Sequence, residues 1–61
     1  MKQLTCIAID DEPIALEIME EYISKTELLD LKGLFQNPIE ALQFLQKELI
    51  DVVFILSLIH I

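Results

Sequence analysis

Apolar and polar positions alternate along the chain in blocks that predict strand, helix, strand, helix and strand. Residues 4–9 are short, apolar and partly β-branched, and they stop at Asp10-Asp11, which indicates a buried strand. Residues 14–24 have the apolar period of a helix, and Pro13 suits its start because a first-turn proline loses no hydrogen bond. The apolar stripe expected to face the core comprises Ala15, Ile18, Met19, Tyr22 and Ile23.

The second half of the chain continues this alternation. Residues 29–35 predict a more peripheral strand, in which Gly33 indicates a bulge or a close backbone contact. Asn37-Pro38 is typical of a helix start, with an N-cap followed by proline, and this helix is expected over about 38–48. The apolar positions expected on its inner face are Ala41, Leu42, Phe44, Leu45 and Leu49.

The third strand and the overall topology follow from the remaining residues. Residues 52–55 are continuously apolar after Asp51, which predicts a strand buried on both sides. Strands that alternate with helices predict an α/β fold with a parallel sheet, and right-handed crossovers restrict its topology. If the second strand lies on one side of the first and the third on the other, the order is 2-1-3 and the two helices cover opposite faces. In that order Asp10 and Asp11 end the central strand at a switch point, where open α/β sheets bind ligands.

Composition and charge exclude several classes of protein. The 61 residues are about half an ordinary domain, yet 54% are hydrophobic, too many for a disordered segment. One cysteine and one histidine allow neither an internal disulfide nor a zinc cluster. A net charge of −7 argues against nucleic-acid contact by this segment. No signal peptide is visible, and the uncharged run 52–61 is too short to span a bilayer, so we expect a cytoplasmic protein without membrane contact.

The acidic pair is the candidate for chemistry. Mg²⁺ is usually held by one or two carboxylates and water, so Asp10 and Asp11 at a strand end could form a metal site. The alternative is an exposed acidic turn that caps the following helix. Asp-Asp-Glu-Pro between an apolar strand and an amphipathic helix is a stronger indication of a site than two carboxylates alone.

Three segments together resemble the receiver domain of two-component response regulators. Residues 6–16, with Asp10-Asp11-Glu12-Pro13, resemble its start, most closely in the branch whose output is a LytTR-type DNA-binding domain. Residues 37–42 resemble its second helix and residues 51–55 its third strand. The resemblance implies a flavodoxin-like fold with the strand order 2-1-3 and helices on opposite faces, of which residues 1–55 would be the N-terminal half. It also implies signal transduction by phosphorelay in a parent regulator of transcription.

The resemblance also implies roles for individual residues. Asp10 and Asp11 would hold Mg²⁺, Asp10 through water and Asp11 more directly, with weak or absent binding in this chain. A histidine kinase or small phosphodonor would be the parent's partner, and the first helix would help to contact the kinase. The phosphoacceptor aspartate should follow Ile55, but Leu56 occupies that position. No catalytic residue and no enzymatic activity are therefore expected.

Residues 56–61 are expected to be a non-native tail. Leu-Ser-Leu-Ile-His-Ile is what the codons CTG TCT CTT ATA CAC ATC encode, a transposon end used in sequencing-library adapters. The alternatives are a natural frameshift or a divergent strand end. The nucleotide sequence distinguishes them, because any other codons would exclude the adapter.

Two other functions remain open from the residues alone. One is a Mg²⁺-dependent phosphotransferase or hydrolase of another α/β family, against which stand the lack of an Asp-x-Asp motif and of a glycine-rich loop. The other is a small interaction protein without catalysis. That protein would pair through its apolar third strand. In a receiver fragment the same strand would form a long unpaired edge, so we expect self-association through it.

Overall fold

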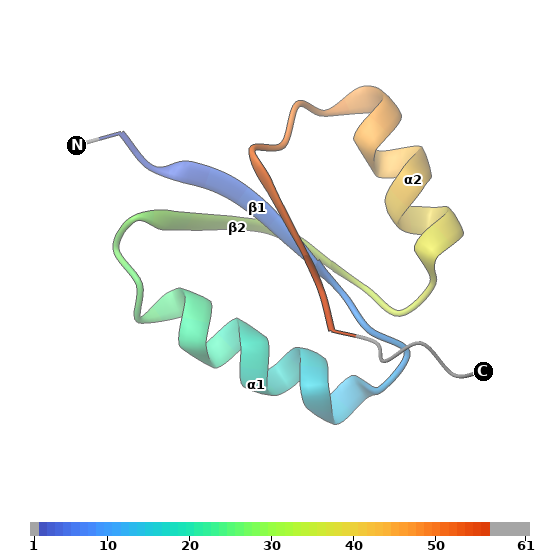
Figure 1. The fold of residues 1–61 in the computed structure, drawn as a ribbon, viewed down its shortest axis with the longest axis horizontal. Coiled ribbons are helices and arrows are strands. Elements are labelled where there is room, and N and C mark those ends of the chain that lie inside the picture. The colour runs from blue at the N-terminus through green and yellow to red at the C-terminus, as the bar shows by residue number, and fades with distance from the viewer. Residues whose placement is uncertain (1, 57–61) are drawn as a thin grey trace.

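The computed structural model describes residues 2–56, which form three strands and two helices in the predicted order (Figure 1). The elements are β1 (Leu4–Ile9), α1 (Pro13–Ser24), β2 (Leu29–Phe35), α2 (Pro38–Lys47) and β3 (Val52–Ile55). The sheet is parallel with the order β2-β1-β3. The predicted α/β class and strand order are therefore confirmed.

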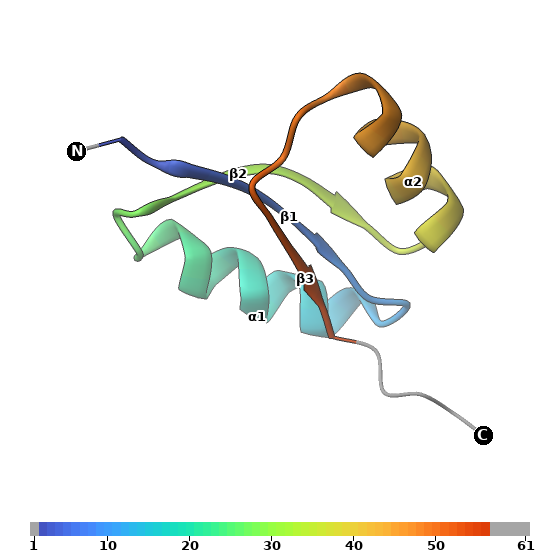
Figure 2. The same cartoon turned by 45° about the horizontal axis from the view of Figure 1, so that its top comes forward.

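The central strand β1 carries the core on both of its faces. Cys6, Ile7 and Ala8 are fully buried. Ile7 and Ile9 pack with Ala41 of α2, whereas α1 contacts β1 and β2 and buries Leu16 and Ile23 outside that cluster. The two helices consequently cover opposite faces, and Figures 1 and 2 show them on either side of the strands.

The buried face of α1 differs from the predicted stripe. Leu16 and Ile23 are buried, whereas Ile18 and Tyr22 are 49% and 65% exposed. Apolar residues occupy more than half of the circumference of this helix, so the 3.6-residue period fits more than one stripe. Only contact with the sheet decides which of these stripes is buried.

Burial in α2 and β3 is also lower than predicted. Leu42 on α2 and Leu49 beyond its end are exposed. The prediction that β3 is buried on both sides is wrong, because Val53 and Ile55 are exposed. Contacts between helices and strands go mainly to β1 and β2, which leaves β3 without a helix over either face.

The bulge predicted at Gly33 is confirmed. Cys6 of β1 pairs with Leu31 and Ile7 pairs with Gly33, so Lys32 is the extra residue in β2. A Cβ atom on Gly33 would lie 2.9 Å from Cε2 of Phe35. The glycine therefore makes room for the Phe35 ring in the core.

Asn37 caps α2 as predicted. Its Oδ1 atom accepts a hydrogen bond of 2.8 Å from the Ile39 N–H. No helix within residues 2–56 is long and apolar enough to cross a bilayer. Of the expected tail 56–61 only Leu56 is described, so the origin of that tail stays a prediction.

Candidate functional site

The candidate site lies where the central strand ends between its two neighbours. The Asp10 N–H donates to the Phe35 carbonyl of β2 over 3.0 Å, and the Leu56 N–H donates to the Ile9 carbonyl over 3.1 Å. Asp10 is only 5% exposed. The backbone thus fixes Asp10 at the switch point of the sheet, where the sequence places it.

The Asp10 carboxylate also shapes the turn into α1. Its Oδ1 atom accepts a hydrogen bond of 2.9 Å from the Glu12 N–H. Glu12, the N-cap residue, makes no side-chain capping bond of its own, and Pro13 begins the helix. This bond agrees with the capping role of the acidic-turn alternative, although Asp10 is buried and not exposed. It also holds the carboxylate in a fixed direction.

Asp11 completes the acidic pair with an exposed side chain. One fixed and one open carboxylate, with water, are a ligand set that Mg²⁺ accepts in proteins. Within residues 2–56, no group of three or more His, Cys, Asp or Glu side chains is placed to hold a metal. The donor chemistry therefore suits a partial, weak magnesium site.

Position 56 lies beside this pair. Ile55 aligns with Ile9 in the parallel ladder, so the next residue on each strand, Leu56 and Asp10, come side by side. The hydrogen bond from the Leu56 N–H to the Ile9 carbonyl holds that alignment. The Leu56 side chain offers neither a nucleophile nor a metal ligand.

A cleft of about 460 Å³ opens near the carboxyl end of β2, between the starts of the two helices. Its lining includes Leu16, Glu17, Phe35 and Glu40. Asp10 and Asp11 are not part of it. This cleft is therefore separate from the acidic pair, of which Asp10 is buried and Asp11 exposed.

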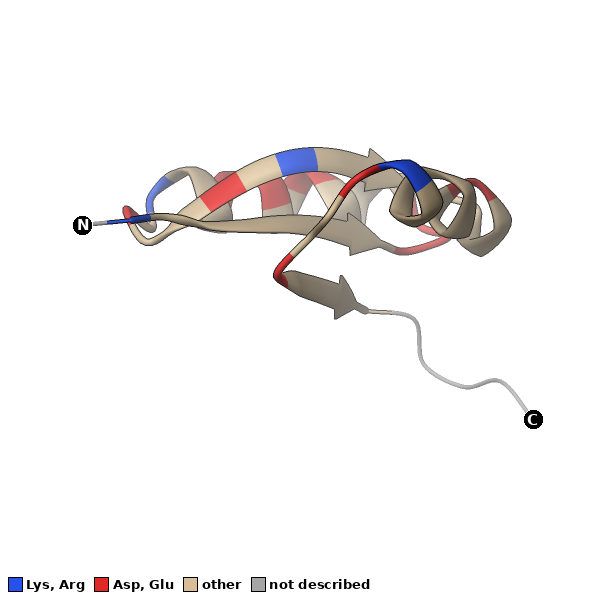
Figure 3. Ribbon diagram, turned by 90° about the horizontal axis from the view of Figure 1, so that it is seen from above, with Lys and Arg blue, Asp and Glu red and all other residues tan. Residues whose placement is uncertain are grey.

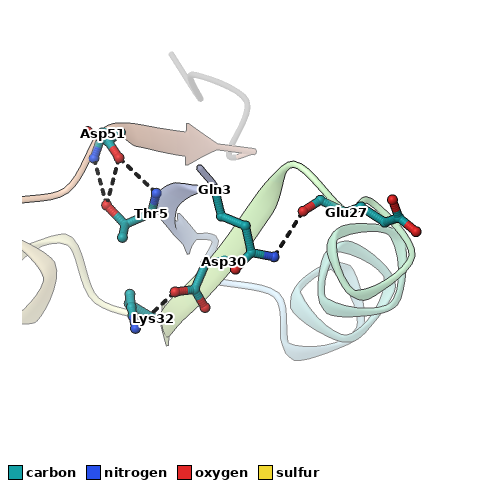
Figure 4. Close-up of polar contacts among 6 residues, drawn as sticks. All are labelled: Gln3, Thr5, Glu27, Asp30, Lys32 and Asp51. Atoms are coloured by element: carbon teal, nitrogen blue, oxygen red, sulfur yellow. Dashed lines mark hydrogen bonds and ion pairs between the residues drawn. The ribbon is translucent and has the colours of Figure 1, made fainter. Parts of the chain in front are cut away.

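An anchor between β1 and β3, which sequence reasoning missed, lies at the other end of the sheet (Figure 4). The Asp51 Oδ2 atom accepts hydrogen bonds from the Thr5 N–H at 2.9 Å and from the Thr5 hydroxyl at 3.1 Å. The Asp51 N–H donates to Thr5 Oγ1 and to the Thr5 carbonyl, each at 3.1 Å. This anchor sets the register that brings position 56 to Asp10.

The outer surface of α1 carries an exposed apolar ridge. Ile14, Ile18 and Tyr22 recur every four residues and are all exposed. Residues four apart lie on one side of a helix. Exposed acidic side chains at Glu17 and Glu21 lie beside this ridge, so the outer side of α1 combines apolar and negatively charged groups.

The single thiol is not a candidate nucleophile. Cys6 is fully buried in β1 and forms no disulfide. Burial raises the pKa of this thiol above its ordinary value, and the negative charge of Asp30 raises it further. Because the thiolate is the reactive form, Cys6 is a packing residue.

Comparison of the chain with protein families, with curated proteins and with solved structures finds no match. Assignment to a receiver domain therefore rests on the resemblance of three segments, residues 6–16, 37–42 and 51–55.

Proposed function

We propose that this chain is the first part of a phosphorelay receiver domain, whose parent is a regulator of transcription. One observation carries the proposal. The ladder between β1 and β3 brings position 56 beside Asp10, so an acidic pair and the expected phosphoacceptor position meet at one strand end. That arrangement suits transfer of a phosphoryl group to a carboxylate with a metal beside it.

Asp10 and Asp11 would supply the metal ligands in this function. The hydrogen bond from the Glu12 N–H orients Asp10, while Asp11 stays open to a hydrated ion. A bound Mg²⁺ would neutralise charge that develops on the phosphoryl oxygens. With leucine at position 56, this chain would keep part of the metal site and would not accept a phosphoryl group.

The exposed ridge on α1 would be a contact surface for a kinase. Ile14, Ile18 and Tyr22 offer apolar contact along the helix, and the neighbouring glutamates favour a basic partner. This role is the one that the family resemblance implies for the first helix.

The proposal is tested by restoring a carboxylate at position 56. The wild-type chain and Leu56→Asp are incubated with acetyl phosphate and Mg²⁺, and the intact mass and hydroxylamine sensitivity of the products are measured. In Leu56→Asp the introduced carboxylate oxygen attacks phosphorus, the bond to the acetate oxygen breaks, and an acyl phosphate forms. We expect this adduct in Leu56→Asp and none in the wild type.

Two control variants distinguish the loss of a metal ligand in the acidic pair from the loss of one negative charge elsewhere. Asp11→Asn in the Leu56→Asp background removes a proposed metal ligand, whereas Glu48→Gln in the same background removes an equal charge at an exposed position beyond α2. We expect the first change to abolish the adduct and the second to keep it. The proposal fails if the wild type is labelled, if Leu56→Asp is not, or if labelling is independent of Asp11.

A further inference from the structure

The apolar sequence of β3 does not by itself specify how the strand aligns with β1. Register is normally fixed by the alternation of apolar and polar residues, because a shift of one residue exchanges the two faces of a strand. Residues 49–56 contain a single polar side chain, that of Asp51. Figure 3 shows no charged position along β3, where Asp51 precedes the strand. A shift of one residue would largely exchange one apolar side chain for another, so apolar burial hardly distinguishes the registers.

β1 does not impose a single register on its neighbours. Its ladder with β2 shifts by one residue between Cys6 and Ile7. Its ladder with β3 runs without a shift, from Cys6 opposite Val52 to Ile9 opposite Ile55. Because β2 and β3 occupy both edges of β1, a further strand cannot pair with β1. The alignment of β3 with β1 therefore depends on contacts between these two strands.

The side-chain hydrogen bonds between Thr5 and Asp51 exist in one register only (Figure 4). The Thr5 hydroxyl donates to Asp51 Oδ2 and accepts from the Asp51 N–H, each at 3.1 Å. The Thr5 N–H donates to the same carboxylate oxygen at 2.9 Å. A shift of one residue moves β3 by about 3.3 Å and turns the carboxylate to the other face of the sheet. These bonds cannot survive that change, because the Thr5 side chain stays on its own face.

The register of β3 decides which residue meets the acidic pair. In the observed register position 56 lies beside Asp10. A shift of one residue toward the carboxyl end would bring Ile55 there, and a shift in the other direction would return position 56 to Ile9. In both cases the side chain at position 56 turns to the opposite face of the sheet, away from Asp10.

We propose that Thr5 and Asp51 are positioning residues for the expected phosphoacceptor position, because they select the register of β3 that brings it to Asp10. Asp51 precedes position 56 by five residues, which is roughly 16 Å at about 3.3 Å per residue. Neither residue therefore touches a reacting group. The role of position 56 rests on the proposed function, whereas the selection of the register does not.

The test is NMR spectroscopy of the wild-type chain and of two variants at Thr5, without Mg²⁺ or a phosphodonor. Thr5→Val keeps the shape of the side chain and removes the hydroxyl, whereas Thr5→Ser keeps the hydroxyl and is the matched control. Chemical-exchange measurements at the amides of β3 detect a minor register that interconverts with the main one. We expect its population to rise at least about fivefold in Thr5→Val, the factor for the loss of about one net hydrogen bond. In Thr5→Ser it should stay close to the wild-type value.

The backbone chemical shifts of the minor state distinguish a change of register from fraying. A slipped strand keeps the shifts of a β-strand at residues 53–55, whereas a frayed strand has those of an unfolded chain. Asp51→Ala is the second variant, and it should populate the same minor state because it removes the acceptor of the Thr5 hydroxyl. A minor state with unfolded shifts, an equal rise in Thr5→Val and Thr5→Ser, or no rise in Thr5→Val and Asp51→Ala would overturn the proposal.

Failure of this inference and failure of the proposed function give different results. If the register populations change as expected but Leu56→Asp accepts no phosphoryl group, the receiver function fails, and with it the role of position 56. If Leu56→Asp is labelled but the populations do not respond to Thr5 and Asp51, only the positioning role fails.

Discussion

Replacing Asp51 by alanine should detach the start of β3 from β1. The change removes the acceptor of the Thr5 N–H at 2.9 Å and of the Thr5 hydroxyl at 3.1 Å. Hydrogen bonds to charged groups contribute roughly 1.5–3 kcal/mol, and neutral ones about 1. Because Asp51 is exposed and water competes for it, we expect a total loss of about 1–2 kcal/mol, toward the lower end of what two bonds could give.

Amide hydrogen exchange measures this loss at the residue that experiences it. A loss of 1–2 kcal/mol corresponds to roughly 5–30-fold faster exchange at the Thr5 amide. The neighbouring Leu4 amide is an internal control, since it donates to the Leu28 carbonyl on the side of β2 at 2.7 Å. Asp51→Asn is the matched variant, because its side-chain oxygen can still accept both bonds, and it should cost less than Asp51→Ala.

Three outcomes would refute this reasoning. Unchanged exchange at Thr5 in Asp51→Ala would mean that the carboxylate does not hold the strand. Acceleration of Leu4 as large as that of Thr5 would mean that the variant acts on the whole fold and not on this anchor. A loss in Asp51→Asn as large as in Asp51→Ala would mean that accepted hydrogen bonds are not the cause.

Three further changes test the packing, the capping and the pH response of the fold. Gly33→Ala places a Cβ 2.9 Å from the Phe35 ring and should lower the free energy of unfolding in urea by about 1–3 kcal/mol through overpacking. Asn37→Ala should cost about 1 kcal/mol in the same assay, and Asn37→Asp should restore most of it. Burial raises the pKa of the Cys6 thiol, so the thiol of the unfolded chain ionises first as pH increases. The contribution of Cys6 to stability should therefore be constant below about pH 8.5 and fall above it, by at most about 1.4 kcal/mol per pH unit. Cys6→Ala should lose this pH dependence, and a wild-type chain equally stable at pH 8 and pH 10 would contradict it.

Features fixed by neighbouring residues were predictable from the sequence. The stop at Asp10, the cap at Asn37 and the bulge at Gly33 each follow from the backbone preference of one residue beside a periodic segment. Alternating strands and helices with right-handed crossovers leave few topologies, and the resemblance to a receiver domain selected the order 2-1-3 among them. The acidic pair was therefore placed correctly at the end of the central strand.

Features that depend on contacts between distant residues were not predictable. The buried face of α1 is ambiguous in the sequence because apolar residues cover much of the helix, and only the sheet selects Leu16 over Ile18 and Tyr22. The anchor between Thr5 and Asp51 joins residues 46 positions apart, and no local pattern marks either of them. Exposure of β3 was missed because an apolar run does not reveal whether a helix covers it.

The most direct measurement is paramagnetic mapping of divalent-cation binding, with Mn²⁺ in place of Mg²⁺ and backbone amide signals as the readout. We expect weak binding, with a Kd on the order of 10⁻³ M or weaker. The broadening should centre on Asp10, Asp11 and Leu56 and disappear in Asp11→Asn but not in Glu48→Gln. Broadening that follows the exposed glutamates of α1 as strongly as Asp11, or that spares Leu56, would contradict a metal site at the expected phosphoacceptor position.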